Sequence, residues 1–265
     1  MTSIRKPFTT LAGAALVAAL VGTHANADTI GLNFVATSDQ RSVSVADATL
    51  ASGDVTGVVA AGNWNNSNDG TGLSQDGAIG SLANLTDDTG AATTADATWT
   101  ATAPFQGLAG MDSNSADQVP TNAFETLFGH ASGMPFDGNT SRTYEVDLTD
   151  VPYDLYDVYV YVGDTRFSTA EIEIELTPGG GSPLIETATL VGTPGAGFDD
   201  ATADGTGNYV LFDGITADSF GLDLRTITGN NKQIYGLQIF QVPEPASLAL
   251  MGLGGLVVLS RRRSA

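Results

Sequence analysis

The sequence contains no cysteine and few basic residues. No disulfide can stabilise the chain, and zinc sites built on cysteine thiolates are excluded. Between residues 28 and 242, 29 acidic residues stand against five basic ones, a net charge of −24. Proteins hold nucleic acid backbones mainly through Lys and Arg. We therefore expect no nucleic acid partner, and the acidic body favours cations or a cation-bridged matrix of acidic polymers.

Histidine is scarce as well, which bears on catalysis. A hydrolase triad needs a base that exchanges a proton near neutral pH, usually His, beside an activated Ser or Cys. His130 is the one histidine between residues 28 and 242, and no Gly-x-Ser-x-Gly elbow is present. Acidic residues are so abundant that carboxylate pairs at glycosidase distances carry no information. We expect no catalytic residues and no enzyme.

The N-terminus has the three parts of an export signal. The segment MTSIRK is positively charged, Leu11–Val21 is apolar, and Ala25 and Ala27 form a small-x-small pattern before Asp28. This apolar run is much shorter than the roughly 20 residues that span a bilayer as a helix. The sequence predicts that residues 1–27 are a signal peptide, with a signal helix, that signal peptidase removes.

The C-terminus also has three ordered parts. Pro243-Glu244-Pro245 breaks the chain, because proline lacks an amide donor and restricts the residue before it. Ala246–Ser260 carries no charge and reaches roughly 22 Å as a helix, at about 1.5 Å per residue. Arg261, Arg262 and Arg263 follow, and the positive-inside rule places them on the cytoplasmic side. The sequence predicts a C-terminal transmembrane helix.

The order Pro-Glu-Pro, short apolar helix and terminal arginines resembles the PEP-CTERM sorting tail of Gram-negative bacteria that produce exopolysaccharide. The resemblance covers residues 242–265 and implies cleavage near the Pro-Glu-Pro motif by exosortase, a membrane-embedded transpeptidase. It implies a transient stay in the inner membrane, and then the cell surface, a biofilm or the extracellular matrix. The alternative is a plain tail anchor.

The body, residues 28–241, is predicted to be one all-β domain, a two-sheet antiparallel sandwich of jelly-roll type. Short β-rich segments alternate with clusters of Gly, Asn, Asp and Thr. The segment AEIEIEL predicts a strand with Ile172 and Ile174 buried and its glutamates in solvent. Only TNAFETLFGH, residues 121–130, has helical spacing. The predicted strands are Ile30–Val35, Thr98–Thr102, Arg142–Leu148, Leu155–Val162, Ala170–Leu176, Leu184–Val191, Tyr209–Phe212, Ser219–Leu224 and Ile234–Val242.

Two stretches of the body, AGNWNN at residues 61–66 and YDLYDVYVYVGD at residues 153–164, resemble a recurrent exported β-sandwich of PEP-CTERM proteins from aquatic bacteria. No activity is assigned to that sandwich. The resemblance implies the fold and nothing about chemistry.

The segment NNSNDGTGLSQD is a candidate calcium loop. A loop of the EF-hand type places oxygen ligands at positions 1, 3, 5 and 12, with Gly at position 6. Asn65, Ser67, Asp69 and Asp76 fill the ligand positions in turn, although Asn replaces the first Asp and Asp replaces the bidentate Glu. Asn-Asp-Gly sequences also make ordinary turns. Calcium is the one candidate cofactor, and the alternative is a turn without an ion.

Carbohydrate contact is the other candidate role. Tyr159 and Tyr161 share one face of their strand, and Trp64 lies in an Asn-rich segment expected to be a loop. Exposed rings there would stack on sugars, whereas buried rings would only fill the core. Three functions follow: a non-catalytic surface or matrix protein that contacts exopolysaccharide, a carbohydrate-binding module, or a carbohydrate-active enzyme. We favour the first.

Overall fold

The computed structural model describes residues 28–34, 49–67, 79–101, 127, 134–136, 144–164, 170–190, 197–228 and 232–243. Asp28–Glu244 forms one compact unit. The predicted signal helix, the predicted transmembrane helix and His130 lie outside the described residues. Within the described ranges, no helix is long and apolar enough to cross a membrane.

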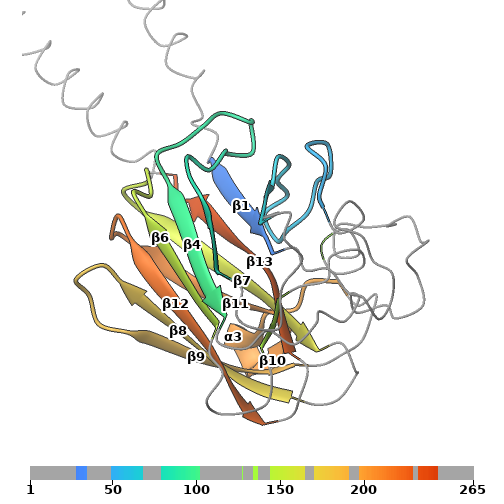
Figure 1. The fold of residues 1–265 in the computed structure, drawn as a ribbon. Helices are drawn as coiled ribbons and strands as arrows, with labels where there is room; N and C mark the ends of the chain where they lie inside the picture. The colour runs from blue at the N-terminus through green and yellow to red at the C-terminus, as the bar shows by residue number, and fades with distance from the viewer. Residues whose placement is uncertain are drawn as a thin grey trace, which may run out of the picture. The chain divides into compact units, whose positions relative to one another are not determined.

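The described strands form two sheets (Figure 1). The first sheet has the order β11-β7-β13-β1-β2, with β5 paired to β13. Its strands are Tyr209–Ile215, Tyr156–Asp164, Lys232–Gln241, Thr29–Asn33, Asn65–Asn66 and, for β5, Met134–Phe136. The second sheet has the order β10-β9-β8-β12-β6-β4-β3. Its strands are Thr206–Gly207, Leu184–Leu190, Ala170–Pro178, Phe220–Thr228, Tyr144–Thr149, Asp96–Ala101 and Ile79–Leu82.

The all-β, two-sheet architecture is confirmed, and each of the nine predicted segments overlaps a strand. The prediction of purely antiparallel sheets is wrong, because β2 runs parallel to β1 and β10 runs parallel to β9. Both of these added strands have only two residues, too few for an alternating pattern to be visible in sequence. The jelly-roll connection stays a prediction. Of the predicted helix at residues 121–130, only Leu127 is described, and it is helical and buried.

One hydrophobic core lies between the sheets. On β8, Ile172 and Ile174 are fully buried and the glutamates between them are partly exposed, as the alternation predicts. The facing side chains from the first sheet include Val158 and Val160 of β7. Phe34, just after β1, meets Trp99 of the second sheet edge to face, with ring centroids 6.0 Å apart. Burial of such residues supplies the main free energy of folding, since the chain has no disulfide.

Candidate functional site

The two stretches AGNWNN and YDLYDVYVYVGD meet on the outer face of the first sheet. The ring of Trp64 lies 6.1 Å from that of Tyr161, centroid to centroid. Trp64 rests on two glycines of the sheet: a Cβ atom on Gly31 would lie 2.6 Å from its Cδ2 atom, and one on Gly236 would lie 3.3 Å from Cζ3. Trp64 is 4% exposed, and its Nε1 donates to the carbonyl of Ala61 at 2.9 Å. A second hydrophobic cluster thus covers this face.

Residues 50–64 cover the outer face of the first sheet, and we call them the covering segment. Two buried polar side chains of the sheet, Tyr161 and Gln238, bind this segment. The hydroxyl of Tyr161 donates to Oε1 of Gln238 and accepts from the amide of Val58 at 2.8 Å. Nε2 of Gln238 donates to the carbonyl of Val59 at 2.7 Å. Burial raises the pKa of the Tyr161 hydroxyl well above its usual range, so it stays a neutral donor. These bonds fasten the covering segment to β7 and β13.

The asparagines after Trp64 replace backbone pairing with side-chain amides. Asn66 donates to the carbonyl of Leu50 at 2.9 Å and accepts from the amide of Leu50 at 2.9 Å. The side chain of Asn65 bonds to Thr86 in the same way: it donates to the carbonyl of Thr86 at 2.8 Å and accepts from the amide of Thr86 at 2.9 Å. Each side-chain amide therefore pairs with a peptide group as a neighbouring strand would. The Asn-rich segment fastens adjacent loops.

Trp64 and Tyr161 are buried, so neither can stack on a sugar, and only Tyr159 remains accessible among the three predicted contacts. Tyr159 is half-buried beside Tyr209 of β11, with ring centroids 6.0 Å apart and planes at 50°. Tyr209 was not among the sugar contacts predicted from the sequence. The pairing of β11 with β7, which sets Tyr209 opposite Tyr161, could not be read from either strand alone.

Carboxylates lie near the Tyr159–Tyr209 pair. Burial, followed by the charges of Asp157 and Asp200, raises the pKa of Tyr159. Burial and then Asp200 raise the pKa of Tyr209. Both hydroxyls are therefore neutral at physiological pH. The pair offers two partly exposed aromatic faces with carboxylate acceptors close by, a combination that suits a polyhydroxylated ligand.

The candidate calcium loop is divided between described and undescribed residues. The side-chain oxygen of Asn65 accepts from both the amide and the hydroxyl of Thr86, at 2.9 and 3.0 Å. Ser67 is buried, and its amide donates to the carbonyl of Asn33. Asp69 and Asp76 lie outside the described residues. Within the described part of the chain, no group of three or more His, Cys, Asp or Glu side chains is placed to hold a metal ion.

A second acidic segment, residues 200–205, forms helix α3, Ala201–Asp204, with its caps. Asp200 is the N-cap, and its carboxylate accepts from the amide of Thr202 at 2.9 Å. Gly205 ends the helix at φ 80°, a left-handed conformation that glycine adopts without strain. The acidic side chain at the start of this segment therefore caps a short helix.

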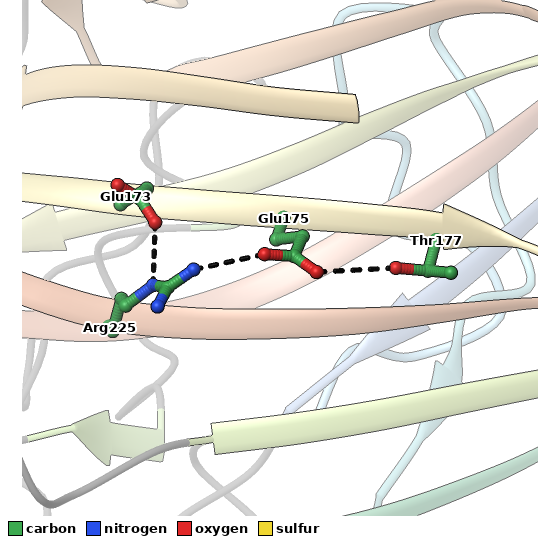
Figure 2. A network of polar contacts seen from close by, with 4 residues as sticks. All are labelled: Glu173, Glu175, Thr177 and Arg225. Carbon is green, nitrogen blue, oxygen red and sulfur yellow. Dashed lines mark hydrogen bonds and ion pairs between the residues drawn. The ribbon is translucent and has the colours of Figure 1, made fainter. Parts of the chain in front are cut away.

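Glu173 and Glu175 of β8 are partly exposed and pair with one arginine (Figure 2). Nε of Arg225, on β12, lies 2.6 Å from Oε1 of Glu173, and Nη2 of Arg225 donates to Oε2 of Glu175 at 2.9 Å. The hydroxyl of Thr177 approaches the other oxygen of Glu175 at 3.4 Å. Arg225 is directly opposite Glu173 in the register of β8 and β12. The arrangement is a solvated ion-pair network.

The sorting residues lie where the fold ends. β13 ends at Gln241, the amide of Val242 donates to the carbonyl of Leu155 at 3.0 Å, and Pro243 is exposed. The other sorting and cleavage residues lie outside the described ranges: Ala25, Ala27, Glu244, Pro245, Arg261, Arg262 and Arg263.

Comparison with known proteins identifies the tail. No curated protein matches the chain. The solved structure of TmCBM61 in complex with beta-1,4-galactotriose is similar at 10% identity and a TM-score of 0.31, over 44% of this chain and 77% of that chain. A similarity at that score assigns neither fold nor ligand. Residues 241–264 match the family described as the PEP-CTERM protein-sorting motif. The chain therefore carries a PEP-CTERM sorting tail, the kind of signal that marks an exported protein for exosortase.

Proposed function

We propose that the chain is a non-catalytic protein of the cell surface or extracellular matrix of a Gram-negative bacterium, released there when exosortase cuts near Pro243. The observation that carries the proposal is where the last core strand ends. β13 ends at Gln241, and the sorting motif begins at the same residue. The tail can therefore be removed without breaking a described strand. The apolar run before Arg261 would hold the precursor in the inner membrane until then.

The chemistry of the body supports a structural role. Four polar side chains of the body make bonds within the fold: Asn65 and Asn66 pair with loops, Asp200 caps a helix, and Glu173 pairs with Arg225. A body with a net charge of −24 between residues 28 and 242 would associate with acidic exopolysaccharide through divalent cations.

The test is C-terminal processing in a host with and without a working exosortase. We expect the wild-type protein to be released from the inner membrane with an intact mass that lacks Ala246–Ala265. Changing Glu244 to Ala should leave insertion intact and keep the full-length precursor in the inner membrane. The matched control is Glu186→Ala, a glutamate of β9 far from the tail in sequence, which should be processed normally. A released protein that still ends at Ala265 would contradict the proposal.

Carbohydrate binding is the second candidate function, and the Tyr159–Tyr209 pair favours it. The pair combines two partly exposed rings with the neighbouring carboxylate of Asp200. Sugars bind to such surfaces by stacking on aromatic faces while carboxylates accept their hydroxyl hydrogens.

A glycan array with the released protein tests this second function. If the pair binds sugar, Tyr159→Ala and Tyr209→Ala should each lower the signal at least tenfold, because each removes half of the stacking surface. Ile185→Ala is the control, since this side chain is 54% exposed on β9 in the other sheet. Signals that survive both tyrosine substitutions would exclude the pair as the binding site.

A further inference from the structure

Three carboxylates gather where β1 begins. Asp28 immediately precedes this strand, and its amide nitrogen lies 3.4 Å from Oε1 of Gln241 on β13. Asp88 is held beside it, because its amide donates to the carbonyl of Thr29 at 2.8 Å and its Oδ1 accepts from the amide of Thr29 at 3.2 Å. The adjacent Asp87 is 8% exposed. We call Asp28, Asp87 and Asp88 the aspartate cluster.

The aspartate cluster has an excess of negative charge. Burial, followed by the charges of Asp87 and Asp88, raises the pKa of the Asp28 carboxyl. Among the residues whose side chains the structure describes, Arg225 on β12 is the cationic one. Arg225 pairs with glutamates of β8. No described cationic side chain is therefore placed to neutralise the cluster.

A buried hydroxyl lies within electrostatic range of the same cluster. Tyr153 is 7% exposed, and its hydroxyl has no hydrogen-bond partner among the residues that the structure describes. Burial raises the pKa of this hydroxyl, and the next causes are the charges of Asp28, Asp87 and Asp88 in that order. A buried polar group without a partner costs free energy. The cluster and Tyr153 together form a place that suits a small cation with several hydrogen-bond donors.

We propose that the α-ammonium group created at Asp28 by signal-peptide cleavage is the counter-ion of the aspartate cluster. Hydrolysis of the Ala27–Asp28 peptide bond consumes one water, leaves a carboxylate on Ala27 and leaves a protonated amine on Asp28. The neutral amide of the precursor has one donor, whereas the ammonium has three. Oε1 of Gln241 is an acceptor 3.4 Å from this nitrogen, and the aspartate cluster supplies the negative charge around it. The proposal rests on the signal-peptide cleavage predicted from the sequence, and it makes export a step that stabilises the fold.

The pH dependence follows from the charges. Neighbouring carboxylates raise the pKa of the α-ammonium in the folded state above its ordinary value of about 7.7–8.0. The stabilisation is therefore fully present below that ordinary value and is lost as pH rises through the folded pKa. On the acid side it weakens as the Asp28 carboxyl, whose pKa is raised by burial and then by the neighbouring charges, becomes protonated.

The experiment modifies the α-amine of the exported protein in two ways that differ only in charge. Acetylation removes the positive charge, and reductive dimethylation keeps it. Lys232 carries the other amine of the chain after residue 27, so Lys232→Arg makes the α-amine unique while preserving side-chain charge. Intact mass first establishes that the chain begins at Asp28. Thermal melting then follows at pH 6, at low salt and in EDTA, so that no metal ion can occupy the cluster.

We expect acetylation to lower Tm by about 2–4 °C relative to dimethylation, the shift typical of a small loss of stability in a domain of this size. Asp88→Asn keeps the acceptor for Thr29 but removes one charge, and it should reduce the acetylation effect by at least half. The α-amine pKa, from the pH dependence of the acetylation rate, should lie above 8. Neutral and charged modifications with equal Tm would overturn the proposal, as would an undiminished effect in Asp88→Asn. A chain that begins elsewhere than Asp28 would overturn it too, without touching the C-terminal mass that tests the proposed function.

Discussion

The two sheets share one core but have different outer faces. The outer face of the first sheet is covered: Trp64 lies on Gly31 and Gly236, and Tyr161 is fully buried beneath the covering segment. The outer face of the second sheet is open to solvent, with Glu173 and Glu175 sharing Arg225. The covered face is held by packing and buried amides, and the open face is charged and hydrated.

This difference between the outer faces is visible in the residue types at the outward positions of the strands. In AEIEIEL the outward positions are all glutamates, which cannot be buried cheaply without partners, so that face must remain in water. In YDVYVYVGD the outward positions include Tyr159 and Tyr161, which tolerate burial once the hydroxyl finds a partner. Tyr161 finds Gln238. Aromatic residues at outward positions of a strand therefore indicate a sheet that something else covers.

The strongest test of the covered face is Trp64→Ala, which removes the largest side chain of the covering segment. We expect a loss of about 3–5 kcal/mol in the free energy of unfolding, because it leaves a cavity against the sheet. Urea unfolding measures it. Ile185→Ala on β9 is the control and should change stability by less than about 0.5 kcal/mol. A loss for Trp64→Ala as small as the control's would show that the face is not truly covered.

Gly31→Ala tests the contact from the side of the sheet. The new Cβ atom would lie 2.6 Å from the Trp64 ring, closer than packed atoms allow. We expect a loss of about 1–3 kcal/mol from overpacking. In the Trp64→Ala background the same change should cost much less, because the clashing ring is gone. Equal costs in the two backgrounds would contradict the stacking of Trp64 on Gly31.

Asn66→Asp tests the side-chain amide of Asn66, which pairs with the peptide groups of Leu50 as a neighbouring strand would. The substitution keeps the size and the acceptor but removes the donor to the carbonyl of Leu50. We expect the free energy of unfolding to fall by about 1–3 kcal/mol at neutral pH, because the carbonyl of Leu50 and the new carboxylate are both acceptors and cannot bond to each other. Chemical denaturation measures it, with the exposed Thr187→Ala on β9 as a control expected to have little effect. Stability equal to wild type would show that Asn66 is dispensable.

Asp223→Asn tests the open face and should stabilise the protein. Burial, followed by the charges of Glu145 and Glu175, raises the pKa of Asp223 above 3.8. A raised carboxyl pKa means that the ionised form costs stability above that pKa, and that the cost vanishes as pH falls below it. We expect a gain of about 0.2–1 kcal/mol at pH 7, reduced by salt, and none at pH 3. The exposed Asp154→Asn is the control, and an equal gain at both pH values would refute the charge explanation.

Calcium is expected to have a small effect on stability. A loop with two carboxylates, Asp69 and Asp76, belongs at the weak end of known sites, about 10⁻⁴–10⁻³ M. Calcium at 1 mM would then raise the free energy of unfolding by about 0.4–1.4 kcal/mol. Thermal melting with and without calcium measures this, and Asp69→Ala with Asp76→Ala should abolish any shift. A shift that persists in the double variant would place the ion elsewhere.

Strand positions were largely predictable, whereas the candidate binding residues were not. Alternation in AEIEIEL predicts the burial of Ile172 and Ile174 because side chains of a strand point to opposite faces in turn. The same rule places Tyr159 and Tyr161 together on one face, but it does not say that one is buried and the other half-buried. That difference depends on the covering segment and on Tyr209, which reach β7 from distant parts of the chain.

The sequence by itself determined the sorting tail of this protein and the inward faces of its strands. The C-terminal sorting signal is local: proline, apolar length and charge all lie within residues 241–264, so neighbours in the chain suffice to specify it. Only the tertiary structure decided that Trp64 is buried, that Asn66 stands in for a strand, and that Asp88 lies beside Asp28. Each of these contacts joins residues far apart in the chain. Burial and charge depend on what surrounds a side chain in space, and no local pattern records that.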